Sequence, residues 1–348
     1  MRVFFSGSTN AVKMVIKSRL SGLLGTTLLL VLFALPVLSY AGEKKGGFVL
    51  SFDDGYPSWM SVVADKLASV GGKATGFVNN HRLQGGKLSY GDVLTLQNKY
   101  GWEIGTHTYH HHNAPQYVKK NGLADWLSKE LDASVKDLES HGLIIKNIVF
   151  PYNEFTPELK TEVLKRLESL RNRDILPISK GLREDKTFPG SAIDMSQYTP
   201  LDLIFKMIDM AADKGEYLFL YGHEILPDEQ FIAGSVESVS QNSITTSEAV
   251  PPISNGVTLC MIPDSRVRYH GPSVKIVSIS DKTINVSANA LQTLTKPGAN
   301  FLIGPCYGMR ISDFNKMIDY AATRLKFYTA HEIASMNNNK TTQINTRE

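Results

Sequence analysis

Two adjacent carboxylates are the strongest chemical signal in this sequence. Asp53 and Asp54 follow the apolar run 46–52, which predicts a buried strand. Neighbouring side chains of a strand point to opposite faces, but Gly55 allows the chain to turn at the strand's end, where both acids can reach one pocket. Two like charges held that close resist ionising together unless a cation lies between them. The pair therefore predicts a metal site.

Histidines that follow a later strand supply further ligands for such a site. Four of the nine histidines fall within His107–His112, directly after a predicted strand at 102–106. His107 and His111 are four residues apart, so on one helical turn they would share a face. Two imidazoles and one carboxylate leave open metal positions, as catalytic zinc sites require, and iron, cobalt and nickel accept the same ligands. The alternative, a solvated loop without function, is disfavoured by the shared position at strand ends.

Two more strand ends carry candidate residues. In the segment 149–153, Pro151 fixes the backbone and Asn153 tolerates a left-handed conformation, so the turn can aim a backbone N–H into the site. His223 follows a predicted strand at 217–221. A lone histidine is usually a structural residue, but its position at a strand end, like that of the other candidates, favours a catalytic role.

The elements that must position these residues alternate between short apolar runs and amphipathic segments. We predict strands at 48–52, 74–78, 102–106, 144–150 and 217–221, and helices at 58–67, 89–99, 123–141, 156–170 and 201–214. Such alternation predicts parallel strands with helical crossovers, in either a barrel or an open α/β sheet.

A change in amino-acid composition divides the chain further. Residues 227–308 are rich in Ser, Thr, Val, Gly and Pro, and short β-like runs at 256–262, 274–279 and 283–287 predict a small all-β insertion. The α/β pattern resumes with a helix at 311–325 and a strand at 326–328. The predicted organisation is therefore a first α/β part at 42–226, the insertion at 227–308, completion of the α/β part at 309–336, and a polar, disordered tail at 337–348.

The first 41 residues are typical of an export signal. Four basic residues and no acid precede a short apolar segment that ends in small residues, which predicts a cleaved leader and a periplasmic or secreted protein. An uncleaved N-terminal membrane anchor is the alternative. Of 37 basic and 34 acidic residues, the leader takes four basic ones, so 33 stand against 34 in the remainder. This balance does not favour a nucleic-acid partner.

Cysteine usage adds one exclusion and one open question. Cys260 and Cys306 are too few to build a cysteine-based metal site. In an oxidising compartment they can pair, or they can remain buried free thiols.

The set of motifs resembles the polysaccharide deacetylases, the NodB-homology domain of carbohydrate esterase family 4. Ser51–Gly55 (Ser-Phe-Asp-Asp-Gly) resembles the family's first motif, and the run Glu103–His111 resembles its second, a His-Ser/Thr-x-x-His motif with a Glu-Ile-Gly lead-in. The segment 150–153 resembles the third motif in part, and Leu220–His223 resembles the last. The likeness covers about 47–225 and resumes at about 311–334.

This resemblance implies a fold and a division of roles. The fold would be a distorted (β/α) barrel of the NodB-homology type, here with a small all-β insertion. Asp54, His107 and His111 would bind a divalent metal, with zinc the first choice. Asp53 would be the base for a metal-bound water that attacks an acetyl carbonyl. The backbone N–H of Tyr152 would help to hold the oxyanion, and His223 would be the general acid.

The sequence also departs from the family pattern. The third motif usually begins with an Arg that contacts the base, and Val149 stands in that place. Arg171 or Arg183 are candidates to replace it. Asn153 stands where the family has Gly. The acid that orients the catalytic His is not evident, with Asp185 and Asp194 as candidates.

The function expected from these residues is hydrolysis of N-acetyl groups on a cell-envelope or extracellular polysaccharide, which would be the main partner of the protein. The missing Arg motivates an alternative from another class, a glycan-binding protein of this fold with little or no turnover. A third possibility keeps the chemistry but changes the bond, as in an O-acetyl esterase or another amidase.

Overall fold

The computed structural model describes residues 44–336, except for 175, 198, 252–257, 263–273 and 288–290. The predicted leader, the predicted tail and part of the predicted strand at 256–262 lie outside these residues. No helix within the described ranges is both long enough and apolar enough to cross a lipid bilayer.

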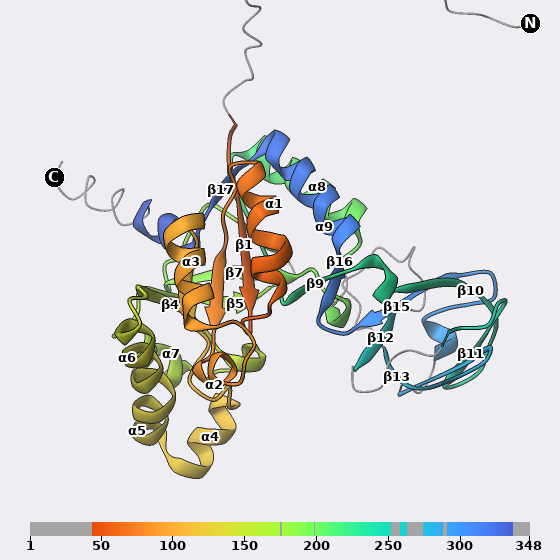
Figure 1. Cartoon of the computed structure of the whole chain (residues 1–348), viewed down its shortest axis with the longest axis horizontal. Helices are drawn as coiled ribbons and strands as arrows, with labels where there is room; N and C mark the ends of the chain where they lie inside the picture. Colours follow the sequence, from red (N-terminus) through yellow and green to blue (C-terminus); the bar gives the residue numbers. More distant parts are fainter. Residues whose placement is uncertain are drawn as a thin grey trace, which may run out of the picture. The chain divides into compact units, whose positions relative to one another are not determined.

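A closed barrel of seven parallel strands forms the α/β part of the chain (Figure 1). The strands follow one another around the barrel, and the last pairs with the first along residues 47–52. They are β1 (Gly47–Asp53), β2 (Thr75–Val78), β3 (Glu103–Thr106), β4 (Ile145–Val149), β5 (Ser169–Arg173), β7 (Thr187–Ala192) and β8 (Tyr217–Gly222). The prediction of a distorted (β/α) barrel is confirmed, and closure between β1 and β8 excludes the open sheet.

Two short strands extend this sheet. β17 (Lys326–Tyr328) pairs in parallel with the first half of β1, and β6 (Ile178–Ser179) pairs antiparallel with β8. The chain that follows the insertion therefore returns to the first strand of the barrel, where the sequence predicted a strand at 326–328.

Helical segments connect the strands, as the alternating pattern predicted. They are η1 (Trp59–Val63), α1 (Ala64–Ser69), α2 (Asn80–Gln84), α3 (Tyr90–Tyr100), α4 (Ala114–Asn121), α5 (Leu123–Trp126), η2 (Leu127–Asp132), α6 (Ala133–Ser140), η3 (Pro151–Asn153), α7 (Pro157–Val163), η4 (Met195–Gln197), α8 (Leu201–Lys214) and α9 (Ile311–Arg324).

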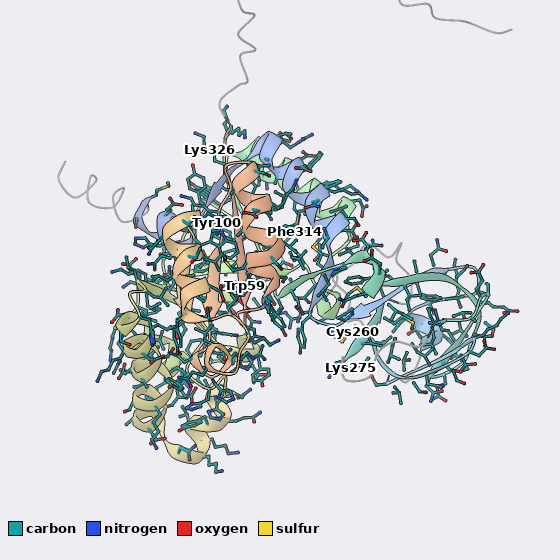
Figure 2. The ribbon with its side chains drawn as sticks, viewed as in Figure 1. Trp59, Tyr100, Cys260, Lys275, Phe314 and Lys326 are labelled. Atoms are coloured by element: carbon teal, nitrogen blue, oxygen red, sulfur yellow. A yellow bond between two sulfur atoms is a disulfide. The ribbon has the colours of Figure 1, made fainter. Side chains whose placement is uncertain are left out.

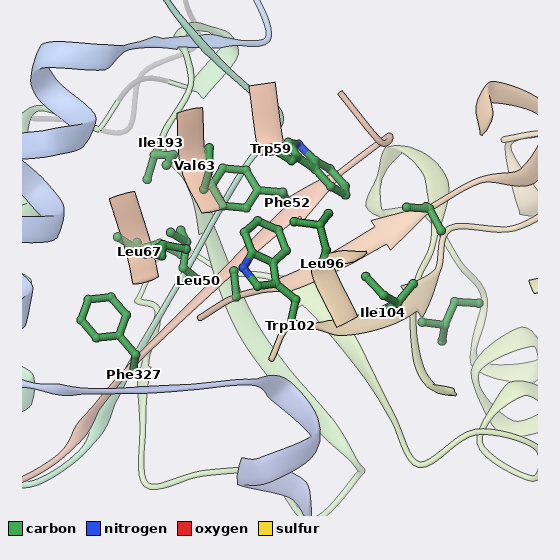
Figure 3. Packing of buried hydrophobic residues seen from close by; sticks show 14 of the residues in the cluster. Leu50, Phe52, Trp59, Val63, Leu67, Leu96, Trp102, Ile104, Ile193 and Phe327 are labelled. Carbon is green, nitrogen blue, oxygen red and sulfur yellow. The ribbon is translucent and has the colours of Figure 1, made fainter. Parts of the chain in front are cut away.

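Aromatic side chains pack where the first helix meets the barrel (Figure 3). The ring of Phe52, on β1, lies 5.9 Å from that of Trp59 and 5.8 Å from that of Trp102, and the two indoles are 6.1 Å apart. All three residues are buried. Because Phe52 immediately precedes Asp53, this packing fixes the end of β1 at the point where the candidate acids begin.

Helix α3 shows how local sequence sets an element's bounds. Ser89 and Asp92 form a reciprocal capping box at its start, and Gly101 adopts a left-handed conformation at its end, with φ of 67°. The predicted helix at 89–99 is confirmed.

The predicted helix at 156–170 is wrong in its second half. Helix α7 ends at Val163, and Ser169–Arg173 form strand β5 between β4 and β7. The apolar residues of 163–170 recur with a spacing that suits a helix, but barrel closure requires a strand here. Pairing with two neighbours outweighs the local preference. Strand β7 was also missed.

An antiparallel barrel of six strands occupies the inserted segment. It consists of β10 (Ile232–Val239), β11 (Ser243–Thr246), β12 (Leu259–Ile262), β13 (Val274–Ser280), β14 (Thr283–Val286) and β15 (Asn300–Pro305), with the short helices η5 (Asp228–Gln230) and η6 (Leu291–Thr293). It has its own apolar core, to which Ile244, Met261 and Phe301 belong. The chain enters it after β9 (Glu224–Leu226) and leaves it into β16 (Gly308–Arg310), and these two strands pair in parallel.

A disulfide joins Cys260 on β12 to Cys306, just after β15 (Figure 2). The sequence left pairing and free thiols open, and the structure has the pair bonded. Both residues are buried beside Met195 and Leu302.

Removal of this disulfide should lower the stability of the protein without changing the parallel barrel. For the 46-residue separation, loop-closure entropy predicts a loss of about 4 kcal/mol in the free energy of unfolding for Cys260→Ser with Cys306→Ser. Denaturant unfolding of this variant and of the oxidised and reduced wild type measures it. Equal stability of all three would contradict the prediction.

Candidate functional site

The candidate residues meet at the carboxyl ends of the barrel strands. Asp53 ends β1, His107 follows β3, Tyr152 lies in the turn after β4, and His223 follows β8. A cavity of about 340 Å³ opens at this end, and all six sequence-predicted residues line it. This is the edge at which parallel α/β barrels place their functional residues.

Three of these residues form a compact group of potential metal ligands. The Nε2 atoms of His107 and His111 are 3.1 Å apart, and they lie 3.8 Å and 3.4 Å from Oδ1 of Asp54. Ligands that each lie about 2 Å from one tetrahedral ion have this spacing. The donor set therefore fits a divalent cation such as zinc.

A loop, rather than a helical turn, brings the two imidazoles together. The predicted helical turn at 107–111 is wrong, because these residues form a loop in which Thr108 and His111 have φ of 65° and 64°. Asp54 also has a positive φ, of 79°, and it precedes Gly55 at 71°. Such conformations are costly for residues other than Gly and collect at functional sites.

A hydrogen bond and burial keep His107 and His111 in the neutral form that can bind a metal. Nδ1 of His107 donates to the carbonyl oxygen of Val149 at 2.8 Å, which leaves the Nε2 lone pair facing Asp54 and His111. Burial lowers the pKa of His107, and burial together with His107 lowers the pKa of His111 to about 4. Both imidazoles are thus held in the unprotonated form that binds metals.

Two residues that the sequence reading missed support Asp54. Asn79 caps helix α2 by accepting from the backbone N–H of Arg82, and its own amide donates to Oδ1 of Asp54 at 3.2 Å. Nη1 of Arg82 lies 2.6 Å from the other carboxylate oxygen. The capped helix therefore sets the orientation of Asp54 and leaves Oδ1 toward the histidines.

Arg171 holds Asp53 by a bidentate, buried ion pair. Its Nη1 and Nη2 donate to Oδ1 and Oδ2 at 2.8 Å and 2.6 Å, and both side chains are almost fully buried. Burial by itself would raise the pKa of Asp53, but Arg171 overcomes it and lowers the pKa to about 2. The guanidinium also stacks 3.9 Å over the ring of Tyr221.

Of the two arginines considered as replacements for the family's Arg, the structure selects Arg171. Arg183 pairs instead with Asp174, at 2.5 Å. The family position holds the buried Val149 on β4, while Arg171 reaches Asp53 from β5, the neighbouring strand. Because the apolar residues of 163–170 have helical spacing, no local pattern indicated that Arg171 points into a barrel.

His223 has an acidic partner in Asp194. Its Nδ1 lies 2.7 Å from Oδ2 of Asp194, which is fully buried. Burial opposes the charge on the imidazole, but Asp194 outweighs it and raises the pKa of His223 to about 9. The other candidate, Asp185, pairs with Lys160.

The turn after β4 has the left-handed geometry expected of it. Tyr152 and Asn153 have φ of 61° and 56°. The ring of Tyr152 is 60% exposed and lies edge-on to the imidazole of His111, with centroids 5.0 Å apart. Asn153 accepts from Nη2 of Arg171 at 3.4 Å, so the residue that replaces Gly contacts the Asp53 support.

The two remaining histidines of the cluster turn away from the cavity. Nδ1 of His110 and of His112 lie 2.7 Å and 2.9 Å from the same oxygen of Glu130, a buried residue of η2. The backbone N–H of His110 also donates to Glu130. These contacts anchor the loop that carries His107 and His111.

Part of the chain is similar in sequence to a known protein family. Residues 41–166 match the family model described as polysaccharide deacetylase. The matched segment comprises 126 of the 348 residues and runs from just before β1 to just after α7. No curated protein sequence matches the chain.

Solved structures of related proteins each match about half of the chain. A family 4 carbohydrate esterase from Streptomyces lividans in complex with acetate is 19% identical, with 52% of this chain and 80% of that chain covered and a TM-score of 0.39. The peptidoglycan deacetylase PdaC from Bacillus subtilis is 21% identical, with 51% and 88% covered and a TM-score of 0.34. A family pseudoenzyme from Bacillus anthracis is 13% identical, with 51% and 55% covered and a TM-score of 0.35.

Loss of Arg171 should destabilise the protein through the uncompensated Asp53. Arg171→Met leaves a buried carboxylate without a counter-charge, which costs about 3–5 kcal/mol in the free energy of unfolding near neutral pH. Because the pKa of Asp53 is lowered, to about 2, its stabilisation is present above its ordinary pKa and is lost as pH falls toward 2.

Urea unfolding from pH 7 to pH 2.5 measures this effect. The gap between wild type and Arg171→Met should be widest near neutral pH and should narrow in acid. Arg183→Met removes a more exposed ion pair and serves as the control, with a smaller loss. A gap that does not change with pH would contradict the assignment to Asp53.

Proposed function

We propose that this protein is a metal-dependent hydrolase that removes N-acetyl groups from a polysaccharide. One observation carries the proposal. A single cavity is lined by three potential metal ligands, by a carboxylate that stays ionised and by an imidazole that stays protonated. Hydrolysis of an amide requires an activated nucleophile, stabilisation of the oxyanion and a proton for the leaving amine. The match of residues 41–166 to the polysaccharide deacetylase family model supports this proposal.

Asp54, His107 and His111 would hold the cation. When bound, a divalent metal lowers the pKa of water and polarises a carbonyl oxygen. Two neutral imidazoles and one carboxylate suit zinc best, and cobalt, nickel or ferrous iron are further candidates.

Asp53 is the residue we assign to the nucleophilic water. Arg171 keeps it ionised through the accessible pH range and fixes both of its oxygens in orientation. A carboxylate with so low a pKa orients water as a hydrogen-bond acceptor and passes a proton on readily. The pair with Arg171 thus supplies orientation rather than basicity.

We assign His223 to the leaving group and Tyr152 to the oxyanion. With its pKa raised to about 9 by Asp194, His223 carries a proton at neutral pH and can donate it to the leaving amine. The backbone N–H of Tyr152, in its left-handed turn at the cavity, is the candidate donor to the oxyanion.

A specific feature favours an amide over an ester. An amine leaves only when it is protonated, whereas an alkoxide leaves an ester with less assistance. The buried pair of Asp194 and His223 maintains such a proton donor. We therefore place N-deacetylation ahead of O-acetyl esterase activity. The contact of Arg171 with Asp53 supports an active enzyme over the binding-only alternative that Val149 raised.

The leader predicted at 1–41 completes the proposal with a location. An exported protein of this kind would meet acetylated polysaccharide in the periplasm or outside the cell.

Acetate release is the direct test of the proposed activity. Residues 42–348, loaded with zinc, should release acetate from at least one of chitin oligomers, peptidoglycan and poly-N-acetylglucosamine. Asp53→Asn should reduce kcat by at least about 100-fold, because the water loses its oriented acceptor. His107→Ala and His111→Ala should lose bound metal, measured by elemental analysis.

Matched variants in the same loop are the controls. His110→Ala and His112→Ala should keep the metal of the cavity, since these rings face Glu130. Release of acetate that survives Asp53→Asn would overturn its role, and bound metal without release from any of the three glycans would favour a binding protein.

The pH profile should report the pair of Asp194 and His223. In the wild type, kcat should fall as pH rises through about 9, where His223 loses its proton. Asp194→Asn removes the charge that raises this pKa, so burial lowers it and the alkaline limb moves to lower pH. Asp185→Asn, which affects an exposed partner of Lys160, should leave the profile unchanged. An unshifted limb in Asp194→Asn would contradict the assignment of His223 as the acid.

A further inference from the structure

The cavity contains an aromatic side chain that the proposed chemistry does not use. Tyr307 lines it and is 48% exposed, although its ring is large and apolar. Tyr221 also lines the cavity, but it is buried beneath Arg171. An exposed aromatic ring within a polar pocket is a typical recognition element, because it offers a large contact surface with few rotatable bonds.

Tyr307 is placed beside the proposed general acid. Its ring lies 5.0 Å from the imidazole of His223, at an interplanar angle of 56°. Its carbonyl oxygen accepts from the backbone N–H of Glu224, the next residue after His223, at 3.0 Å. A group that contacts Tyr307 would therefore lie on the side of the cavity where the leaving amine receives its proton.

The inserted barrel supplies and anchors this residue. Tyr307 follows β15 and immediately follows Cys306, which is bonded to Cys260 on β12. The backbone N–H of Cys306 donates to the carbonyl oxygen of Thr258, at 2.9 Å. The disulfide also packs on Met195 of η4, whose neighbours Ser196 and Gln197 line the cavity. The insertion thus lines the cavity directly through Tyr307 and packs, through the disulfide, on η4, which also lines it.

The chemistry of the leaving side identifies the ligand. On the proposed function, the leaving amine belongs to an amino sugar, and a pyranose ring presents a face of C–H groups that packs well on an aromatic ring. We propose that Tyr307 binds the N-acetylhexosamine residue under attack by stacking on its sugar ring, and that the inserted barrel in this way determines which acetylated glycan enters the site. This inference rests on the proposed function.

Binding measured without turnover tests the inference. The probe is N-acetylchitopentaose, titrated calorimetrically into zinc-loaded Asp53→Asn protein. Adding Tyr307→Ala should weaken binding about five- to tenfold, because the stacked ring is lost, while Tyr307→Phe should retain most of the affinity. Val277, which is 69% exposed on β13 of the insertion and does not line the cavity, provides the control variant Val277→Ala, with unchanged binding.

Kinetics on the same oligomer separate binding from positioning of His223. With Asp53 intact, Tyr307→Ala should raise KM more than it lowers kcat. Unchanged affinity in Tyr307→Ala, a loss confined to kcat, or no binding of the pentamer by the parent protein would overturn the proposal. Binding that depends on Tyr307 without release of acetate by the wild type would uphold it and refute the proposed activity instead.

Discussion

The buried ion pair between Arg171 and Asp53 is the constraint on which the site depends. An unpaired charge at either position is unfavourable inside the barrel, so each residue stabilises the fold only in the presence of the other. The pair joins β1 to β5 across the barrel and leaves the oxygens of Asp53 fixed at the cavity. It also explains how a chain with Val149 in the family's Arg position retains a counter-charge for the acid. The guanidinium reaches the acid from β5, the strand beside β4, which carries Val149.

Each remaining part of the site depends on a similar support behind it. A backbone carbonyl fixes His107, a capped helix orients Asp54, and Asp194 keeps a proton on His223. The unfavourable backbone conformations at Asp54 and His111 are held by the same surroundings. Because of these supports, titratable groups that lie close together keep different protonation states. Acid–base hydrolysis requires such a difference. The geometry of the supports therefore matters as much as the identity of the ligands.

The inserted barrel has a core of its own and yet borders the cavity. Its two ends are adjacent because β9 and β16 pair in parallel, so a long excursion of the chain returns to the residue after His223. Such an arrangement allows an additional domain to alter substrate recognition without disturbing the strands that carry the chemistry. The disulfide between Cys260 and Cys306 ties β12 to the end of β15, next to Tyr307.

The sequence by itself determined the α/β class, the strands that end at the site and the six residues at those strand ends, because apolar periodicity and short motifs are local properties. The family match of residues 41–166 agrees with that reading. Only the tertiary structure decided which of two arginines holds Asp53 and which of two acids holds His223. The arginine lies on β5 and the acid lies after β7, and each is far in sequence from the residue that it holds. It also replaced the helix predicted through 170 with a strand, because closure of a barrel depends on neighbours that no local pattern reveals. The contribution of Tyr307 to the cavity was hidden for the same reason. A residue 84 positions after His223 meets it only when the insertion has folded and returned.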